Sequence, residues 1–256
     1  MSRIARRIAA IALAVAGVAH AQGDARRSGF DFMSPATQAM QRDDTSNPAM
    51  LSVGDGEALW RAAAGRAGKS CADCHGDAKT GMRGVAARYP SYDLTAARPL
   101  TLAQRVDACR VRHQQAPTLA PESRERLALE SYVALQSRGM PIAPPDDARL
   151  APYRERGEKL WRARVGQLDL ACAQCHDAHA GERLGGSVVP QAHPTGYPIY
   201  RLEWQSLGSL ERRLRGCLFG VRAQVPPAGA IELVELEVWL AARAAGMAVD
   251  APGVRP

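Results

Sequence analysis

The sequence predicts an all-α protein made of two tandem units, and two observations support this fold. The first is an internal repeat, since residues 56–61 read GEALWR and residues 157–162 read GEKLWR. In each copy a tryptophan, Trp60 or Trp161, lies eleven residues before a Cys-x-x-Cys-His sequence. The second is the helical spacing of apolar residues, with no convincing alternating strand. Two units of roughly one hundred residues each fall within the usual size range of domains.

The N-terminal residues 1–21 have the pattern of a secretory signal peptide. Three arginines within the first seven residues precede an apolar run at 8–18, and a small-x-small sequence follows at 19–21. That run is too short to span a bilayer, and no later stretch approaches the roughly 18 apolar residues that a membrane helix requires. We therefore expect an exported protein that does not span a membrane.

Composition limits the classes of partner. The predicted signal peptide holds three arginines and no acidic residue, so its removal lowers the formal net charge from +7 to +4. No basic block is interleaved with aromatic residues, and nucleic-acid binding therefore receives no support. Aromatic residues make up only 5% of the chain, which favours a cofactor as part of the apolar core.

After the signal peptide the chain divides into an arm and two domains. Residues 22–50 are polar and irregular and predict an extended arm that is flexible or wraps around the protein. A proline-rich acidic linker at 140–147 marks the boundary between an N-terminal domain, 51–145, and a C-terminal domain, 146–256.

Helical signals dominate both units. Leucines in 207–214 follow helical spacing, and Ile231, Val234 and Val238 form one stripe of a longer helix whose glutamates face elsewhere. Each unit closes with a predicted helix followed by Gly-Met, where glycine suits a helix C-cap.

Each unit contains one c-type haem attachment sequence. Two thiols three positions apart can each form a thioether with a haem vinyl group, while the adjoining histidine reaches the iron. Three disulfides or a zinc site would also use such cysteines, but neither explains the histidine after both pairs. We therefore predict two covalently bound haem c groups and two tandem cytochrome c-type domains with little β structure. The attachment residues are Cys71, Cys74, His75, Cys172, Cys175 and His176.

Two further cysteines occupy equivalent positions in the repeat. Cys109 lies twenty residues after Tyr89, and Cys217 lies twenty residues after Tyr197. Thiolate is an established axial ligand of haem iron, and a position that recurs in both units favours the same role in both. We predict that the iron ligands are His75 with Cys109, and His176 with Cys217.

Other ligands and another pairing remain open from the sequence. A single disulfide between Cys109 and Cys217 would join the two units. Methionine or a second histidine could also take the distal position, and the candidates are Met82, Met140, Met247, His113, His179 and His193.

An arginine precedes each lone cysteine by four positions, as Arg105 or Arg213. On a helix the two side chains share a face, and a guanidinium there favours the thiolate by lowering the pKa of the thiol. The surroundings differ, because Arg212, Arg215 and Arg222 lie near Cys217 whereas Asp107 lies near Cys109. A seven-residue insertion, between His176 and Tyr197, is also specific to the second unit.

With both haem motifs, both lone cysteines and the late Arg-x-x-x-Cys in order, the chain resembles the SoxA family. SoxA is the dihaem cytochrome c subunit of the SoxAX complex of bacterial thiosulfate oxidation, an L-cysteine S-thiosulfotransferase. The resemblance implies that Cys109 ligates the N-terminal haem and Cys217 the C-terminal, active-site haem. It further implies a persulfide at Cys217 and a substrate-holding role for Arg213.

The family's reaction joins thiosulfate to a cysteine of the SoxYZ carrier protein and passes two electrons to the SoxX cytochrome. The resemblance therefore implies a periplasmic enzyme with SoxX as partner and SoxYZ as protein substrate. The rival hypotheses are a dihaem electron carrier without sulfur chemistry and a dihaem peroxidase.

Overall fold

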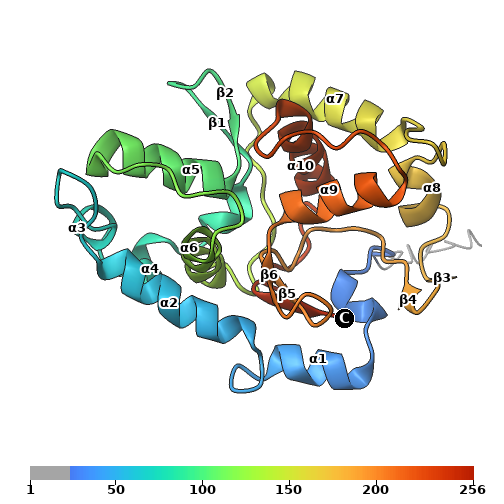
Figure 1. Cartoon of the computed structure of the whole chain (residues 1–256), viewed down its shortest axis with the longest axis horizontal. Coiled ribbons are helices and arrows are strands. Elements are labelled where there is room, and N and C mark those ends of the chain that lie inside the picture. The colour runs from blue at the N-terminus through green and yellow to red at the C-terminus, as the bar shows by residue number, and fades with distance from the viewer. Residues whose placement is uncertain (1–23) are drawn as a thin grey trace, which may run out of the picture.

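The computed structural model of the chain describes residues 24–256, and Figure 1 shows their arrangement. The predicted signal peptide, residues 1–21, lies outside the described residues. Within the described part, no helix is both long and apolar enough to cross a membrane.

The predicted arm is folded onto the C-terminal strand rather than wholly extended. It contains a 3-10 turn, η1 (Gly29–Phe32), and a helix, α1 (Pro35–Arg42), which starts with an N-cap serine and a proline in its first turn. The Gln41 side-chain oxygen accepts a hydrogen bond from the backbone N–H of Val254 at 2.9 Å. In Figure 1 the arm accordingly lies beside the C-terminus.

The first half of the chain follows the arm without a break, because the next helix already begins at residue 49 rather than after residue 50. Its elements are α2 (Ala49–Arg61), α3 (Ala72–His75), α4 (Ala78–Gly81), η2 (Ala86–Arg88), β1 (Ser91–Asp93), β2 (Arg98–Leu100), α5 (Leu102–Cys109), the π-helical turn η3 (Arg110–Gln114) and α6 (Arg124–Leu135).

The second half repeats the main elements in the same order and adds a hairpin. Its elements are η4 (Ala148–Leu150), α7 (Ala151–Arg162), α8 (Cys172–His176), β3 (Arg183–Leu184), β4 (Ser187–Val188), β5 (Ile199–Arg201), β6 (Ser206–Gly208), α9 (Leu210–Gly220), α10 (Ile231–Arg243) and β7 (Gly253–Arg255). Figure 1 shows the first half in blue to green and the second in yellow to red.

A close helix pair forms the centre of each half. Helix α2 packs on α6, and α7 packs on α10. The approach needs glycine at equivalent positions, since a β-carbon at Gly56 would overlap the carbonyl oxygen of Ala128, and one at Gly157 would overlap that of Glu235. The buried tryptophan of each GExLWR sequence belongs to the apolar cluster beside its helix pair.

The structure is helix-rich, as predicted, and also contains short strands that the sequence did not reveal. Strands β1 and β2 form an antiparallel ladder, as do β3 and β4, while β5 pairs antiparallel with β6 and parallel with β7. Leu207 was expected in a helix but lies on β6, and α9 begins only at Leu210 after the N-cap Ser209. Strands of two or three residues are too short for a visible alternation.

Helix α10 agrees only partly with its predicted stripe. Val234 and Val238 are buried as expected, whereas Ile231 is 37% exposed. The glutamates do not all face solvent, because Glu235 is buried and pairs with Arg156 at 2.6 Å. The cause is α7 of the same half, which packs on α10 and supplies Arg156 as a partner for a side chain that the isolated helix would expose.

The two halves are joined through the segments that follow α6 and α10. Gly139 and Gly246 both adopt positive φ, as helix C-cap glycines do. The backbone N–H of Gly139 donates to Val249, and that of Gly246 donates to Ile142, at 2.9 and 2.7 Å. The predicted linker therefore begins as a hydrogen-bonded bridge, with a small apolar core around it made of Ala87, Ala134, Ile142, Ala244, Val249 and Ala251.

Candidate active site

All six cysteines are free thiols in the structure. Neither the three-disulfide arrangement nor a bond between Cys109 and Cys217 is formed. Within the described residues no cluster of three or more histidine, cysteine or acidic side chains is arranged to hold a metal ion. The alternatives of a disulfide framework and a zinc site therefore find no support.

The second attachment motif is a single helical turn, α8, with its histidine held in place. Nδ1 of His176 lies 2.6 Å from the carbonyl oxygen of Pro190, so this nitrogen carries the proton and Nε2 is left for a metal. Trp161 stacks on the imidazole ring with centroids 5.7 Å apart, and its indole N–H donates to Asp177. Burial lowers the pKa of His176, which favours the neutral imidazole that iron requires.

The first attachment motif has a similar frame but is more open. Trp60 lies 5.8 Å from the His75 ring, and its indole N–H donates to the carbonyl oxygen of Gly76. Cys74 and His75 are exposed, whereas Cys175 and His176 are half-buried. Both motifs nevertheless carry two free thiols and an adjacent imidazole on one turn, a donor set that fits haem c.

The fold brings each lone cysteine close to the attachment motif of its own half. Burial raises the pKa of Cys172 to about 11, and the neighbouring Cys217 adds to that rise. In the first half Cys109 likewise raises the pKa of Cys71. Each lone cysteine therefore lies near a thiol of the attachment motif in its own half.

In the first half burial outweighs the predicted effect of the arginine. Arg105 lowers the pKa of Cys109, as expected, but burial raises it by more, so that the pKa of the thiol is raised. Arg105 is also engaged elsewhere, since its Nη1 forms an ion pair with Asp93 at 2.7 Å. Arg112 binds the same carboxylate through two hydrogen bonds of 3.0 and 3.1 Å, so Asp93 partly neutralises the cations around Cys109.

Arg213 is in a different situation. It lies one turn before Cys217 on α9, as predicted, and it is half-buried. Among residues 24–256 its guanidinium has no ion pair and no hydrogen bond. Its charge lowers the pKa of His176 and opposes the rise in the pKa of Tyr197, so it lies near both groups. A cation without a carboxylate partner thus lies near the second attachment motif.

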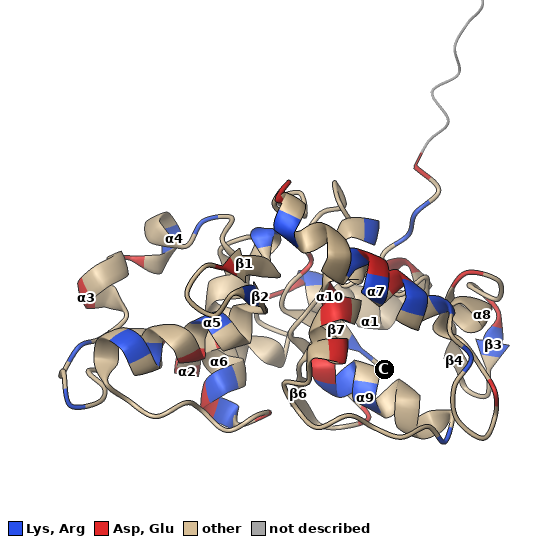
Figure 2. Cartoon of the chain, turned by 90° about the horizontal axis from the view of Figure 1, so that it is seen from above, with Lys and Arg blue, Asp and Glu red and all other residues tan. Residues whose placement is uncertain are grey.

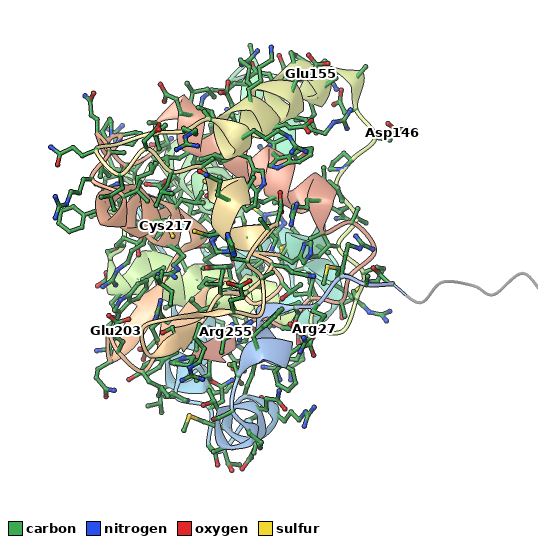
Figure 3. The ribbon with its side chains drawn as sticks, turned by 90° about the vertical axis from the view of Figure 1, so that its right-hand side faces the viewer. Arg27, Asp146, Glu155, Glu203, Cys217 and Arg255 are labelled. Carbon is green, nitrogen blue, oxygen red and sulfur yellow. The ribbon has the colours of Figure 1, made fainter. Side chains whose placement is uncertain are left out.

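The other arginines near Cys217 leave the area positively charged. Arg212 lies 4.0 Å over the Trp204 ring, and Arg215 donates to the carbonyl oxygen of Pro226 at 3.1 Å. Neither contact neutralises the guanidinium. Arg222 is exposed, and a β-carbon at Gly216 would meet open space. Figure 2 shows blue segments on α9, and Figure 3 labels Cys217 together with Glu203 and Arg255.

The methionine and histidine candidates for the distal iron position pack or pair with other residues. Met82 packs in the first apolar core, Met140 approaches Gly84, and Met247 packs in the cluster between the halves. His113 is exposed, and His179 pairs with Glu182. His193 is buried, and burial lowers its pKa to about 4.

The sequence interpretation missed three residues around these sites. Asp93 and Arg201 occupy equivalent ends of β1 and β5, and Pro190 supplies the carbonyl that orients His176. The first two could have been found by extending the repeat alignment from Tyr-Pro-x-Tyr by one residue. Away from the sites, a surface hollow of about 520 Å³ runs along charged residues of α7 and is lined by no predicted site residue.

Comparison with known proteins shows the family of the chain. A family model described as SoxA/TsdA, cytochrome c domain, matches residues 55–142. "L-cysteine S-thiosulfotransferase subunit SoxA" of Pseudaminobacter salicylatoxidans is 38% identical over 229 residues, which are 89% of this chain and 80% of that protein. The corresponding subunit of Rhodovulum sulfidophilum is 36% identical, over 91% of this chain and 81% of the relative.

The chain belongs to the SoxA family. The fold agrees as well, because a chain in the crystal structure of SoxXA from P. pantotrophus superposes with a TM-score of 0.86 at 33% identity, covering 90% of this chain and 87% of that one. As a SoxA-family protein with a cytochrome c domain, the chain carries covalently bound haem c.

Proposed function

We propose that this SoxA-family chain is an L-cysteine S-thiosulfotransferase subunit with its active site at Cys217. It catalyses the oxidative conjugation of thiosulfate to a cysteine of a SoxYZ-type carrier protein. The single observation that carries the assignment of the site is the contrast between Arg213, which has no carboxylate partner among the described residues, and Arg105, which is paired with Asp93. Thiosulfate is a dianion, and an unpaired guanidinium beside a sulfur atom is suited to bind it.

Two haem c groups are proposed, one in each of two domains with their boundary near residue 145. Cys71, Cys74, Cys172 and Cys175 form the thioethers. The iron ligands are His75 with Cys109, and His176 with Cys217. The support is the recurrence of one motif, one tryptophan and one lone cysteine on the same elements of both halves.

The reaction removes two electrons and one proton. A sulfur–sulfur bond forms between the outer sulfur of thiosulfate and the carrier thiol, and the thiol proton is lost to solvent. Haem c supplies a one-electron relay when it is bound, and a SoxX-type cytochrome partner is the proposed acceptor. A SoxX-type partner is supported by the similarity to a chain of SoxXA.

Cys217 and Arg213 have different roles in the proposed site. Arg213 binds the sulfonate oxygens, which orients the outer sulfur toward Cys217. Two-electron oxidation, with a SoxX-type cytochrome as the acceptor, would join the outer sulfur of thiosulfate to the Cys217 sulfur. The carrier thiolate then attacks that outer sulfur, so the bond to Cys217 breaks, the carrier keeps the thiosulfonate group and Cys217 is released. The signal-peptide pattern supports a periplasmic location, where such a carrier would be met.

The test is turnover by the complex of this chain with its SoxX-type partner. Wild-type protein, a SoxYZ-type carrier and thiosulfate should give a carrier mass increased by one thiosulfonate group. Cys217→Ala should reduce this loading to background while haem stays covalently attached. Cys109→Ala is the matched control and should keep the loading, because its site is partly neutralised by Asp93. Full loading by Cys217→Ala would overturn the assignment.

Electron paramagnetic resonance separates the proposal from a simple electron carrier. Thiolate-ligated low-spin haem is expected in the wild type, and each cysteine variant should lose one of two such signals. Methionine-type ligation of both haems would favour an electron carrier without sulfur chemistry.

A further inference from the structure

The repeat reverses the charge of one residue beside the active site. Asp93 and Arg201 are the last residues of β1 and β5, and each strand pairs with its neighbour in the same register. Asp93 precedes Arg105 by twelve residues, and Arg201 precedes Arg213 by the same number. Arg201 therefore stands in the second half where an aspartate stands in the first.

In the first half this position closes the site to anions. The Asp93 side chain is only 4% exposed, and it binds the guanidinium of Arg105 at 2.7 Å and that of Arg112 at 3.0 Å. The backbone N–H of Ala96 donates a further hydrogen bond to it. Any dianion that approached Arg105 would have to displace a buried carboxylate from its two arginines.

In the second half the same position adds a cation. The Arg201 side chain is 12% exposed, and it is fixed by Nε donating to the main-chain oxygen of Pro256 at 2.9 Å. Its Nη2 contacts Glu203 at 2.8 Å, but that carboxylate is 66% exposed. Among residues 24–256 its Nη1 has no partner.

Arg201 also experiences the charge of Arg213. Burial lowers the pKa of Arg201, and Arg213 lowers it further. The pKa of Tyr197, which burial raises, is lowered by the charges of both arginines and raised by Cys217. Arg201 and Arg213 occupy the places of Asp93 and Arg105, whose side chains meet at 2.7 Å in the first half, so the repeat also holds the two guanidinium groups near one another. Such a pair is unfavourable alone and is stabilised by a bound dianion.

We propose that Arg201 is a second substrate-recognition residue, which binds the sulfonate group of thiosulfate together with Arg213. This inference rests on the proposed function and adds to it. Each guanidinium can donate two parallel hydrogen bonds to an oxyanion, so two of them fix its orientation as well as its charge. Glu203 competes with the anion for Arg201, and its exposure makes that competition weak.

The experiment measures binding apart from turnover. Calorimetric titration of the resting complex with sulfate, an unreactive dianion, is combined with the KM for thiosulfate in carrier loading. Arg201→Met should weaken sulfate binding and raise KM, each roughly tenfold or more, with kcat changed less. Arg201→Asp places an aspartate where the first half has Asp93. It should weaken sulfate binding and raise KM more strongly, because the new carboxylate pairs with Arg213.

Two further variants control for folding and for net charge. Glu203→Gln should shift both quantities in the opposite direction, about twofold, because it removes the competitor of the anion. Arg61→Met removes an exposed cation of the first half that pairs with Glu57, and it should change neither quantity. Arg201→Lys keeps the charge and should fall between Arg201→Met and the wild type.

The outcomes separate the two proposals. Unchanged sulfate affinity and KM in Arg201→Met, with an active wild type, would overturn the role of Arg201. If the wild type loads no carrier, the proposed function fails, and the sulfate titration still decides whether Arg201 binds a dianion.

Discussion

The two cysteine sites of this chain are built on the same elements and differ in what surrounds them. Cys109 and Cys217 both follow a short antiparallel strand pair, and both lie one helical turn after an arginine. At Cys109 the arginine is bound by a buried aspartate, whereas at Cys217 the equivalent residue is a second arginine. A duplicated scaffold can thus keep one site closed to anions and open the other by a change at one strand end.

The second difference is the inserted hairpin. The segment containing β3 and β4 exists only in the second half, and it leads into Pro190, whose carbonyl oxygen holds His176. His75 lies exposed in the half without the insertion. The hydrogen bond to the Pro190 carbonyl oxygen fixes the tautomer and the orientation of the His176 ring. A site where bonds form and break needs such fixed geometry more than a site that only transfers electrons does.

The largest effect should come from comparing the two arginines. Arg213→Leu removes the cation that has no carboxylate partner, and kcat/KM for thiosulfate should fall about one hundredfold, as expected for a lost charge-assisted hydrogen bond. Arg105→Leu should leave kcat/KM within about threefold of the wild type. Equal losses in steady-state carrier loading would show that the two sites do not differ as described.

The next effect concerns the helix pairs, which are the same in both halves. Gly56→Ala and Gly157→Ala each place a β-carbon on a backbone carbonyl oxygen of the facing helix. Each should reduce the free energy of unfolding by about 2–3 kcal/mol, despite the better helix propensity of alanine. Urea denaturation of both variants measures this. A stabilisation in either one would mean that the helices of that half can separate without loss.

A smaller effect should appear with pH where the halves meet. Glu130 of α6 and Glu237 of α10 line a cavity of about 30 Å³ together with Glu122, Glu211 and Arg126. Burial raises the pKa of Glu130 to about 7, and it also raises that of Glu237, with Glu130 adding to the shift.

Since the folded-state pKa of Glu130 lies above its unfolded value, its stabilising contribution is complete below about pH 4.5 and is lost as the pH rises through 7. The free energy of unfolding should fall by about 2 kcal/mol across that interval. Glu237→Gln should flatten the profile, and thermal unfolding at several pH values tests it. Identical pH profiles for the wild type and Glu237→Gln would contradict the burial of both carboxyls.

The smallest difference is expected between the tryptophans. Trp161→Phe removes a hydrogen bond to the carboxylate of Asp177, whereas Trp60→Phe removes one to the carbonyl oxygen of Gly76. Bonds to charged groups are stronger, so the loss of stability should be larger for Trp161 by about 1 kcal/mol. Thermal unfolding of the two haem-loaded variants measures both losses of stability. A larger loss for Trp60→Phe than for Trp161→Phe would contradict this prediction.

Features that depend only on the spacing of residues along the chain could be predicted from the sequence. Covalent haem attachment needs cysteines and a histidine at fixed spacing, so both motifs were found in the sequence. The C-cap glycines of the closing helices and the shared face of Arg213 and Cys217 follow from helix geometry in the same way. The strands were not predictable, because their two or three residues take their partners from elsewhere in the chain.

The sequence by itself determined the family, the repeat and the candidate site residues that we propose, since each is expressed in spacing along the chain. Only the tertiary structure decided which arginine is neutralised, because the partner of Arg105 comes from a strand and that of Arg201 from an exposed turn. It also decided that the pKa of Cys109 rises, since burial depends on everything that packs around the thiol. Burial and charge pairing are sums over neighbours in space, and the order of residues does not reveal them.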